Sequence, residues 1–543
     1  MPTIEAKKSD LLKLIGKKLS NAELELALSY AKSEFEGAEE IKIEIADVNR
    51  PDLLSIEGIA RQCKLGLGLI SGLQEYKIKK TNLKIKAKSK TRPLIVAAVV
   101  KNLKFDNESI KQIVQLQEKL CEIFGRKRKE AALGIYDFDR IKWPVKYEDK
   151  EPEKIKFIPL ESSQEMTGKE ILQKHPTGIA YKHLLENEKK YPLLYDSKGN
   201  VLSMPPIINS NYTGKITQAT KNVFIEVTGY NYRFIVPVLN TLVTALADRG
   251  GKIEAVKINN FESPNLNSSK YSLAIEEVNS VLGLELTPNQ IISLLKKYGY
   301  NASGSEKIKI EIPAYRQDIL DSRDIIEDIT IAYEYNKIKT TKPQVTSEGS
   351  ESKEVELSRK ISDLLVGLEF QEIATPNLTS KEILFEKMNK KPQETIEVEN
   401  PVSELYCVLR PELLSSILNF LSKNKTANYP QKIFEIGNTI ENTKDKLKLC
   451  IASTPSNFTE LKQTFDYLAR MFALKYKLEE DEKEEFIEGR CAKIIFDGKK
   501  IGNIGEISPK ILSKFNLEFP VSVLELDLEN LFDFLADQKP QNL

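Results

Sequence analysis

Two stretches decide the fold: IKIEIADVNRPDLLSIEGIAR at residues 41–61 and IKIEIPAYRQDILDSRDIIED at residues 308–328. The pentapeptide IKIEI is identical in both and recurs at an offset of 267 residues. After one deleted residue, two further motifs align, Arg50-x-Asp52 and Arg316-x-Asp318. Weaker similarity extends upstream, so the chain contains an internal repeat, 11–61 and 278–328.

Each copy predicts the same small α/β unit. A capped helix comes first, because Ser20 precedes one helical pattern and Thr287-Pro288 opens the other. An alternating strand follows, with isoleucines on one side and charged residues on the other. The Arg-x-Asp turn then leads into a second helix. Solenoids need at least about three stacked repeats, so we interpret the two copies as related modules that flank a middle region.

The whole chain reads as an α+β multidomain protein, since 543 residues exceed what one core accommodates. The middle region mixes strands, such as PLIVAAVV at 93–100, with amphipathic helices. The polar stretch 339–356 is typical of a linker. After it come alternating strands with turns such as Asp497-Gly498, which favour an antiparallel sheet. We expect four domains, at 1–85, 90–272, 273–340 and 357–543.

Composition excludes several classes of protein. The 80 basic and 79 acidic residues nearly cancel, so any nucleic-acid contact must be local or shared with a partner. The five cysteines lie far apart with no CxxC pair, which argues against a zinc site or a disulfide framework and fits a reducing cytoplasm. No apolar run reaches the roughly eighteen residues of a membrane span. With only two histidines, histidine-based catalysis has few possible positions.

A group of four carboxylates, Asp318, Asp324, Glu327 and Asp328, follows the second IKIEI strand. On a helix, positions 324, 327 and 328 share one face at i, i+3 and i+4 spacing. Oxygen ligands of this kind suit a hard cation such as Mg²⁺. The alternative is an acidic first helical turn that complements the helix dipole.

A second candidate site combines SMPPIIN at 203–209 with the strand FIEVTG at 224–229. Their short polar side chains could line a pocket for a small amino-acid moiety; these are Ser203, Asn209, Glu226 and Thr228. The alternative is a turn followed by an ordinary buried strand.

Two further segments carry weaker signals. The basic run GRKRKE at 125–130 could grip phosphate, or it could simply be a solvated helix C-terminus. In the segment 409–440, Arg410 and a later acidic residue on adjacent strands have the outline of a nucleotide site. No Gly-x-Gly-x-x-x-Arg segment follows, and no Walker or Rossmann glycine pattern occurs elsewhere.

Taken together, these segments resemble the phenylalanyl-tRNA synthetase beta subunits of archaea and eukaryotes. The similarity runs essentially from end to end, in that family's order. Its blocks are NRPDLLSIEGIAR, MPPIIN, GRKRKEAALGIYDFDRI, IPAYRQDILDSRDIIEDITIAYEYNKI, LRPELLSSIL, NYPQKIFEIGN, GRCAKIIF, IGNIGEISP and LELDLE.

The resemblance implies a domain plan: a B1-like module, a B3/B4 editing-like domain, a B5 module, and a class II synthetase-like domain without its catalytic motifs. It implies an α2β2 heterotetramer in the cytoplasm, in which the alpha subunit uses ATP to attach L-phenylalanine to tRNA(Phe). It also implies that Mg²⁺ binds Asp318, Asp324, Glu327 and Asp328, shared with the alpha subunit. The editing pocket for mischarged tyrosyl-tRNA would contain Leu194, Ser203, Glu226 and Thr228.

The chain departs from the family pattern at two positions. The editing pocket would present Glu226 and Asn231 where relatives usually have two aspartates. A longer side chain at 226 displaces the carboxylate, so we expect weak or absent clearance of tyrosine. Two alternatives stay open: a self-sufficient class II ligase, and a module that binds RNA or protein without an enzymatic role.

Overall fold

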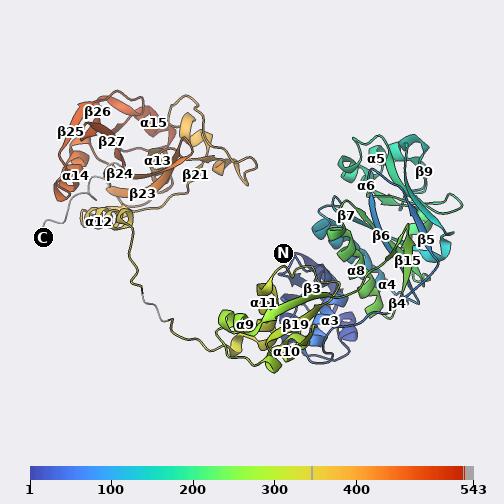
Figure 1. Ribbon diagram of the computed structural model, residues 1–543. Coiled ribbons are helices and arrows are strands. Elements are labelled where there is room, and N and C mark those ends of the chain that lie inside the picture. Colours follow the sequence, from blue (N-terminus) through green and yellow to red (C-terminus); the bar gives the residue numbers. More distant parts are fainter. Residues whose placement is uncertain (344–346, 530, 532–543) are drawn as a thin grey trace. The chain divides into compact units, whose positions relative to one another are not determined.

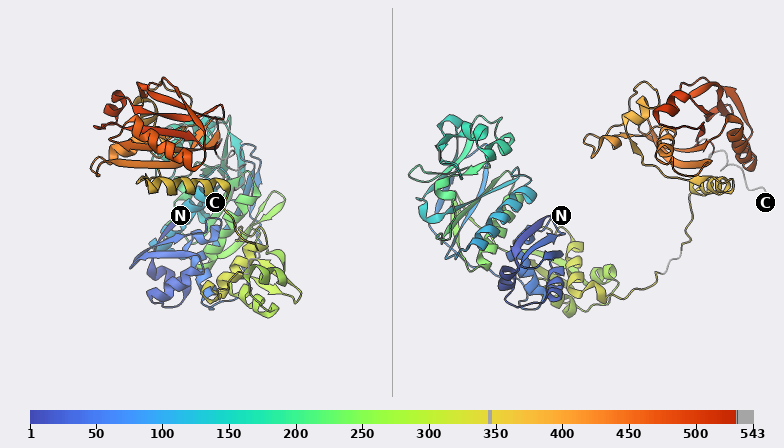
Figure 2. Two further views of the ribbon diagram at one scale, coloured as in Figure 1. Left: turned by 90° about the vertical axis from the view of Figure 1, so that its left-hand side faces the viewer. Right: turned by 180° about the vertical axis from the view of Figure 1, so that it is seen from behind.

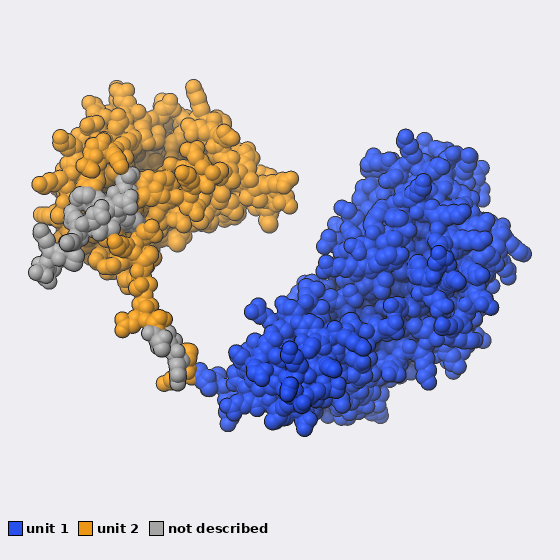
Figure 3. All heavy atoms as spheres, in the orientation of Figure 1, with its two compact units in different colours: residues 1–341 blue, residues 342–543 orange. Residues whose placement is uncertain are grey.

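The computed structural model describes residues 1–343, 347–529 and 531 of the 543-residue chain. It divides into two compact units, 1–341 and 342–543, which Figure 3 colours separately and which are described here one at a time. Residues 344–346 of the predicted linker, and those after 531 in the predicted C-terminal domain, lie outside the described part. Within that part, no helix combines the length and apolar character needed to cross a membrane.

The first repeat copy is a three-stranded antiparallel sheet covered by helices. Ile41, Ile43 and Ile45 are buried in its central strand while the residues between them are exposed, as the alternation predicted. Ser20 accepts a hydrogen bond from the backbone of Glu23 and so caps the second helix. The strands lie in the order β1 (Thr3–Lys7), β3 (Glu40–Ile45), β2 (Ser33–Gly37), and the helices are α1 (Lys8–Ile15), α2 (Asn21–Ser29) and α3 (Ile56–Gly66).

The second copy repeats this arrangement, which confirms the repeat predicted from the sequence. Its strands lie in the equivalent order β17 (Ser269–Ala274), β19 (Lys307–Ile312), β18 (Asn301–Ser303), with helices α9 (Ile275–Leu282), α10 (Pro288–Lys297) and α11 (Ser322–Tyr333). The two copies pack against each other, which the sequence did not reveal. Tyr30 of the first copy joins the apolar core of the second, and its carbonyl accepts a hydrogen bond from the Tyr298 hydroxyl at 3.1 Å.

The stretch of chain between the two copies forms a domain built on one long mixed sheet (Figure 1). Its strand order is β13 (Ile208–Asn209), β12 (Val201–Met204), β11 (Tyr191–Tyr195), β8 (Val145–Lys150), β5 (Lys84–Ala87), β15 (Lys252–Ile258), β6 (Leu94–Lys101), β14 (Val223–Gly229), β7 (Ala131–Asp137). Two further strands, β4 (Ile78–Lys79) and β16 (Phe261–Ser263), also pair with β15. Because β4 and β5 belong to this sheet, the domain takes up residues from 78 onward, earlier than the predicted start at 90.

Helices pack on part of this sheet. The long helix α8 (Tyr232–Asp248) contacts β6, β7 and β14, and α4 (Asn107–Lys119) shares its apolar core. The smaller elements are α5 (Gly168–Lys174), α6 (Pro176–Tyr181), α7 (Asn211–Gly214) and the hairpin of β9 (Lys156–Phe157) and β10 (Met166–Thr167).

Unit 342–543 contains a seven-stranded sheet with helices on both faces. Its order is β20 (Gln371–Glu372), β23 (Gln431–Glu441), β24 (Lys444–Thr454), β28 (Ser522–Asp527), β27 (Lys499–Ile507), β26 (Phe486–Phe496), β25 (Tyr476–Glu480). All neighbouring strands are antiparallel except β20 and β23, in agreement with the predicted antiparallel sheet. A separate hairpin joins β21 (Leu378–Thr379) to β22 (Val408–Leu409).

Alternate residues of β24 enter two different apolar clusters. Leu449 and Ile451 pack with α12 (Lys353–Gly367) and α14 (Phe458–Met471), whereas Cys450 and Ala452 pack with α13 (Leu414–Lys423) and α15 (Pro509–Lys514). Helix α12 runs along the lower side of this unit in every view (Figures 1 and 2). It begins inside the predicted linker, because Ser352 caps its N-terminus.

Candidate functional site

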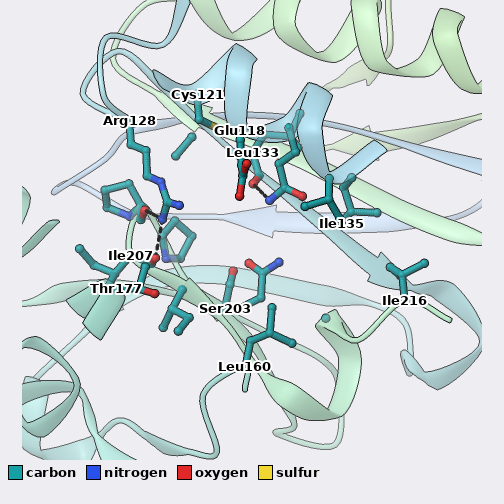
Figure 4. Close-up of a pocket in the computed structure, with 18 of the residues that line it drawn as sticks. Glu118, Cys121, Arg128, Leu133, Ile135, Leu160, Thr177, Ser203, Ile207 and Ile216 are labelled. Atoms are coloured by element: carbon teal, nitrogen blue, oxygen red, sulfur yellow. Dashed lines mark hydrogen bonds between the residues drawn. The ribbon is translucent and has the colours of Figure 1, made fainter. Parts of the chain in front are cut away.

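A cavity of about 560 Å³ opens in the middle domain between α4, strands β7 and β14, and the segment that follows β12 (Figure 4). This volume is within the range of pockets that hold small ligands. Its wall is largely apolar, with contributions from Ile110, Ile113, Leu133, Ile135, Ile207 and Ile208. Two polar side chains predicted from the sequence, Ser203 and Glu226, line it.

Glu226 is the most unusual side chain of the cavity. It is 2% exposed and lies on the central part of β14. One carboxyl oxygen, Oε1, accepts a hydrogen bond from the Tyr136 hydroxyl at 2.9 Å. The other, Oε2, is buried without a hydrogen-bond partner. Burial raises the pKa of Glu226 to about 7, against the opposing effects of Tyr136 and Arg92. The group can therefore be protonated or ionised near neutral pH.

Ser203 supplies a second unpartnered polar atom. Its hydroxyl is buried and forms no hydrogen bond of normal geometry among the described residues, although it interacts with Tyr136 closely enough to lower the pKa of the Tyr136 hydroxyl against the larger effect of burial. Ser203 lies on β12, opposite Leu194 of β11 on one side and opposite Asn209 of β13 on the other. Buried polar groups are rarely left unpaired. Two such groups in one cavity leave hydrogen-bonding positions open to a water molecule or a polar ligand.

The other two predicted pocket residues do not line the cavity. Leu194 is fully buried in the apolar core of the domain. Thr228 is held by Arg92, whose Nε donates to the Thr228 hydroxyl at 3.1 Å and whose Nη2 donates to the Thr228 carbonyl at 2.8 Å. Asn209, also singled out from the sequence, does line it.

Asn231 does not face the cavity, contrary to our expectation. It is exposed, and its side chain accepts a hydrogen bond from the Arg233 backbone at 2.9 Å. That contact caps helix α8. An asparagine in place of aspartate at this position therefore affects a helix terminus and leaves the cavity unchanged.

The basic run 125–130 shapes one wall of the cavity. It follows a π-helical turn at Leu120–Phe124, and Arg126, Lys127 and Arg128 have left-handed φ values of 51°, 53° and 65°. Such conformations are costly for residues with side chains and persist where surrounding contacts fix them. Here Arg92 donates to the carbonyls of Arg128 and Lys129, both at 3.0 Å.

Arg128 also reaches across to the segment after β12. Its Nη1 donates to the Ile207 carbonyl at 2.7 Å, and its guanidinium lies 4.0 Å from the Tyr181 ring centroid. Figure 4 shows this side chain pointing from the upper wall towards Ile207. Arg128 thus holds the cavity wall in place. Neither interpretation of the basic run, phosphate binding or a solvated helix C-terminus, included this role. The sequence also missed Tyr136 and Arg92, because their partners lie far away in the chain.

The four acidic residues considered for magnesium do not gather into one ligand set. Asp324 accepts hydrogen bonds from the backbones of Leu320 and Asp321, at the N-terminus of α11. Glu327 forms a 2.9 Å ion pair with Lys32. Within the described ranges, no three His, Cys, Asp or Glu side chains are placed to hold a metal ion.

Asp318 and Asp328 share a different partner, the buried Arg316. Its guanidinium forms ion pairs with both carboxylates, at 2.7 Å to Asp328. Burial favours the neutral form of Asp318, but Arg316 and Arg50 outweigh it and lower the pKa to about 2. The charge of these carboxylates is therefore already balanced by guanidinium groups. As placed, the four residues do not fit a shared Mg²⁺, and the magnesium assignment remains a prediction.

In the C-terminal unit, Arg410 likewise directs its Nε and Nη1 to partners inside the protein. Its Nη1 pairs with Glu435 at 2.8 Å and donates to the Thr375 hydroxyl at 2.6 Å, and its Nε donates to the Asn438 carbonyl at 3.0 Å. Both charged side chains are about as buried as the core. The sequence correctly predicted that an arginine and an acidic residue lie close together, but Arg410 and Glu435 bind each other.

Comparisons with known proteins cover nearly the whole chain. A family model described as the phenylalanyl tRNA synthetase beta chain CLM domain matches residues 338–528, and a tRNA synthetase B5 domain model matches 271–335. The phenylalanine–tRNA ligase beta subunit of Pyrococcus horikoshii is 42% identical, over 98% of this chain and 100% of that protein. The one from Methanocaldococcus jannaschii is 40% identical, over 97% of this chain and 100% of that protein.

A solved structure is similar to the N-terminal part of the chain. It is an N-terminal fragment of the phenylalanyl-tRNA synthetase beta subunit from Pyrococcus horikoshii. The two share 45% sequence identity with a TM-score of 0.59, and the match covers 61% of this chain and 99% of the fragment.

Proposed function

The chain belongs to the family of phenylalanine–tRNA ligase beta subunits, and we propose that it acts in the cytoplasm as the beta subunit of an α2β2 ligase. The alpha subunit would attach L-phenylalanine to tRNA(Phe) with ATP, and this chain would support that reaction. The observation that carries the proposal is full-length similarity: relatives of this name match the chain from end to end at about 40% identity.

We place the aminoacylation site on the alpha subunit. The antiparallel sheet of unit 342–543 fits a class II synthetase-like fold, but its one buried arginine–glutamate pair is closed on itself. Arg410 directs its Nε and Nη1 hydrogen bonds to protein atoms. A nucleotide would need some of these donors for its phosphates. The chain therefore supports the reaction without carrying it out.

The cavity of the middle domain is proposed as the editing site for mischarged tyrosyl-tRNA. Its apolar wall suits an aromatic side chain, and Glu226 and Ser203 offer the unpartnered polar atoms. A polar group placed against a substrate hydroxyl discriminates strongly between substrates with and without it. The tyrosine hydroxyl is the group that distinguishes this substrate from the correct phenylalanine.

Glu226 would make this editing site weak. Its side chain is one methylene longer than the aspartate usual in relatives, and Tyr136 already holds one of its oxygens. Hydrolysis by a positioned water is sensitive to displacements of about 1 Å. The proposed function assigns no Mg²⁺ to the four acidic residues as they are placed, because Arg316, Lys32 and the start of α11 engage them.

The test uses the chain alone and the chain assembled with its alpha subunit. ATP–pyrophosphate exchange with phenylalanine should appear only in the assembled enzyme. Deacylation of tyrosyl-tRNA by that enzyme should be slow, and Glu226→Asp should speed it by roughly tenfold or more. Asn231→Asp is the matched control: it makes the other departure from relatives but lies outside the cavity, so it should leave the rate unchanged.

The outcomes separate the alternatives. Exchange by the isolated chain would support a self-sufficient ligase. Failure to assemble with an alpha subunit would support a binding module without an enzymatic role. Deacylation by the unmodified enzyme as fast as by Glu226→Asp would show that the longer side chain does not weaken editing.

A further inference from the structure

The segment between Tyr76 and Thr91 is strongly basic. It reads YKIKKTNLKIKAKSKT and holds seven lysines without an acidic residue. No aspartate or glutamate occurs from residue 76 through 105. This concentration stands out in a chain whose 80 basic and 79 acidic residues nearly cancel.

The sheet brings these lysines next to others from distant parts of the chain. Strand β5 lies between β15 and β8, and Figure 1 shows β5 beside β15. In register, Lys84 lies opposite Lys257 and Lys86 lies opposite Lys146. Lys88 directly follows β5. All five side chains are exposed, and we call Lys84, Lys86, Lys88, Lys146 and Lys257 the lysine face.

This arrangement is unfavourable for the protein alone. Neighbouring strands are about 4.8 Å apart, and like charges directly opposite each other destabilise a sheet. Among the residues that the structure describes, none of the five lysines forms an ion pair, whereas Lys79 and Lys80 at the border pair with Glu254 and Glu262. Glu262 on β16 lies opposite Lys257, but its carboxylate pairs with Lys80. The face thus carries five neighbouring positive charges without an ion pair of their own.

The acidic residues close to the face are engaged elsewhere. Asp149 on β8 accepts hydrogen bonds from the Ser89 hydroxyl and from the backbones of Lys90 and Thr91. Glu148 accepts one from the Tyr195 hydroxyl and pairs with Lys150. An external anion is therefore the remaining source of compensating charge.

We propose that the lysine face binds the sugar–phosphate backbone of the tRNA. Several lysines spread over three neighbouring strands suit an extended polyanion better than a small anion, and phosphate contacts position a nucleic acid without reading its sequence. The face lies on the same sheet as the cavity: β8 neighbours β11, and β11 neighbours β12, which carries Ser203. In register, Ser203 lies in line with Leu194 and Tyr147, the neighbour of Lys146, so the lysine face lies on the opposite side of this sheet from Ser203. The tRNA backbone would thus lie against the outer side of the sheet that carries the cavity. Identifying the RNA as tRNA rests on the proposed function.

The experiment removes three charges from the face in the full chain assembled with its alpha subunit. The variant is Lys84→Gln, Lys86→Gln, Lys146→Gln. The matched control is Lys270→Gln, Lys307→Gln, Lys309→Gln, which removes three exposed strand lysines from the second repeat copy. The fluorescence of Trp143, the one tryptophan of the chain, verifies that the middle domain stays folded.

The probe is a tRNA(Phe) transcript titrated at several salt concentrations. For the face variant, the dissociation constant should rise about 10- to 100-fold at low salt, and the slope of log K against log salt should fall by about two to three. The control should change the dissociation constant less than about twofold. In phenylalanine charging, the face variant should have a higher KM for tRNA and an unchanged kcat at saturating tRNA.

An unchanged salt slope, or equal weakening by the control, would overturn the proposal. Loss of assembly with the alpha subunit would also overturn it and would assign the face to a protein contact. If the unmodified enzyme fails to charge tRNA, the proposed function fails, but the lysine face is still judged by the difference in binding between the two triple variants.

Discussion

Glu435 in the C-terminal unit and Glu226 in the middle domain are equally buried glutamates with opposite surroundings. Glu435 accepts hydrogen bonds from the Thr375 backbone at 3.2 Å and hydroxyl at 2.7 Å, and it pairs with Arg410 at 2.8 Å. Glu226 has one partner, and its second oxygen faces a cavity. The charge of Glu435 is matched inside the protein, whereas the unpartnered oxygen of Glu226 is open to a water molecule or a ligand in the cavity.

The largest effect is expected from breaking the buried ion pair of Arg410 and Glu435. Arg410→Ala leaves Glu435 buried without its countercharge, and removing one partner of a buried pair costs about 3–5 kcal/mol. The free energy of unfolding of unit 342–543 should fall by this amount, measured by circular dichroism in urea. Trp143 fluorescence should be unaffected, because Trp143 lies in the other unit.

The control for Arg410 is an exposed pair in the same unit. Lys381 and Glu397 lie 2.7 Å apart, and each is about half exposed. Lys381→Ala should cost less than about 1 kcal/mol, as exposed ion pairs do. Equal losses of stability from Arg410→Ala and Lys381→Ala would contradict the larger cost that we expect for breaking the buried pair.

The second effect concerns Glu226, the buried glutamate with an unpartnered oxygen. Burial raises the pKa of Glu226 from 4.5 to about 7, so the folded state holds the proton more tightly than the unfolded state. The associated stability is fully present below pH 4.5 and is lost as the pH rises through about 7. The separation of the two pKa values corresponds to about 3 kcal/mol.

Glu226→Gln should abolish this dependence, because glutamine does not titrate. The unmodified protein should lose about 2–3 kcal/mol relative to the variant between roughly pH 5 and pH 8. Trp143 fluorescence can follow unfolding here, since the indole lies 5.3 Å from the Phe224 ring, which stacks on Tyr136. Glu262→Gln, an exposed position in the same domain, serves as the control. Parallel pH profiles for unmodified protein and Glu226→Gln would contradict the shifted pKa.

The smallest effect concerns Ser203. Its buried hydroxyl forms no hydrogen bond of normal geometry, so Ser203→Ala removes none and should change stability by less than about 1 kcal/mol in either direction. Ser210→Ala is the comparison: this buried hydroxyl accepts from the Tyr212 backbone at 3.2 Å and caps α7, so its loss should cost about 1 kcal/mol. If Ser203→Ala proves the costlier change, its hydroxyl has a structural partner after all.

The strands and the repeat could be predicted from the sequence because their apolar residues recur with a regular period. Alternating isoleucines identified the strand at 308–312, and the identical strand at 41–45 revealed the repeat. Ser203 and Glu226 were found as short polar residues in apolar surroundings. Tyr136 was missed, because its hydrogen bond to Glu226 joins residues 90 positions apart. Similarly, helical spacing placed Asp324, Glu327 and Asp328 on one face, but Lys32 and Arg316 engage two of them from outside that helix.

The packing of the two repeat copies has a consequence for how the chain assembles. The first copy leads into the middle domain at Gly72 and Leu73, and both donate backbone hydrogen bonds to the second copy, to Lys296 and Asn301. The middle domain is thus an insertion between two halves of an intramolecular pseudodimer. In the unfolded chain it is a long loop, whose closure carries an entropic cost. Once folded, it holds its two ends close together, so the halves meet at a high effective concentration.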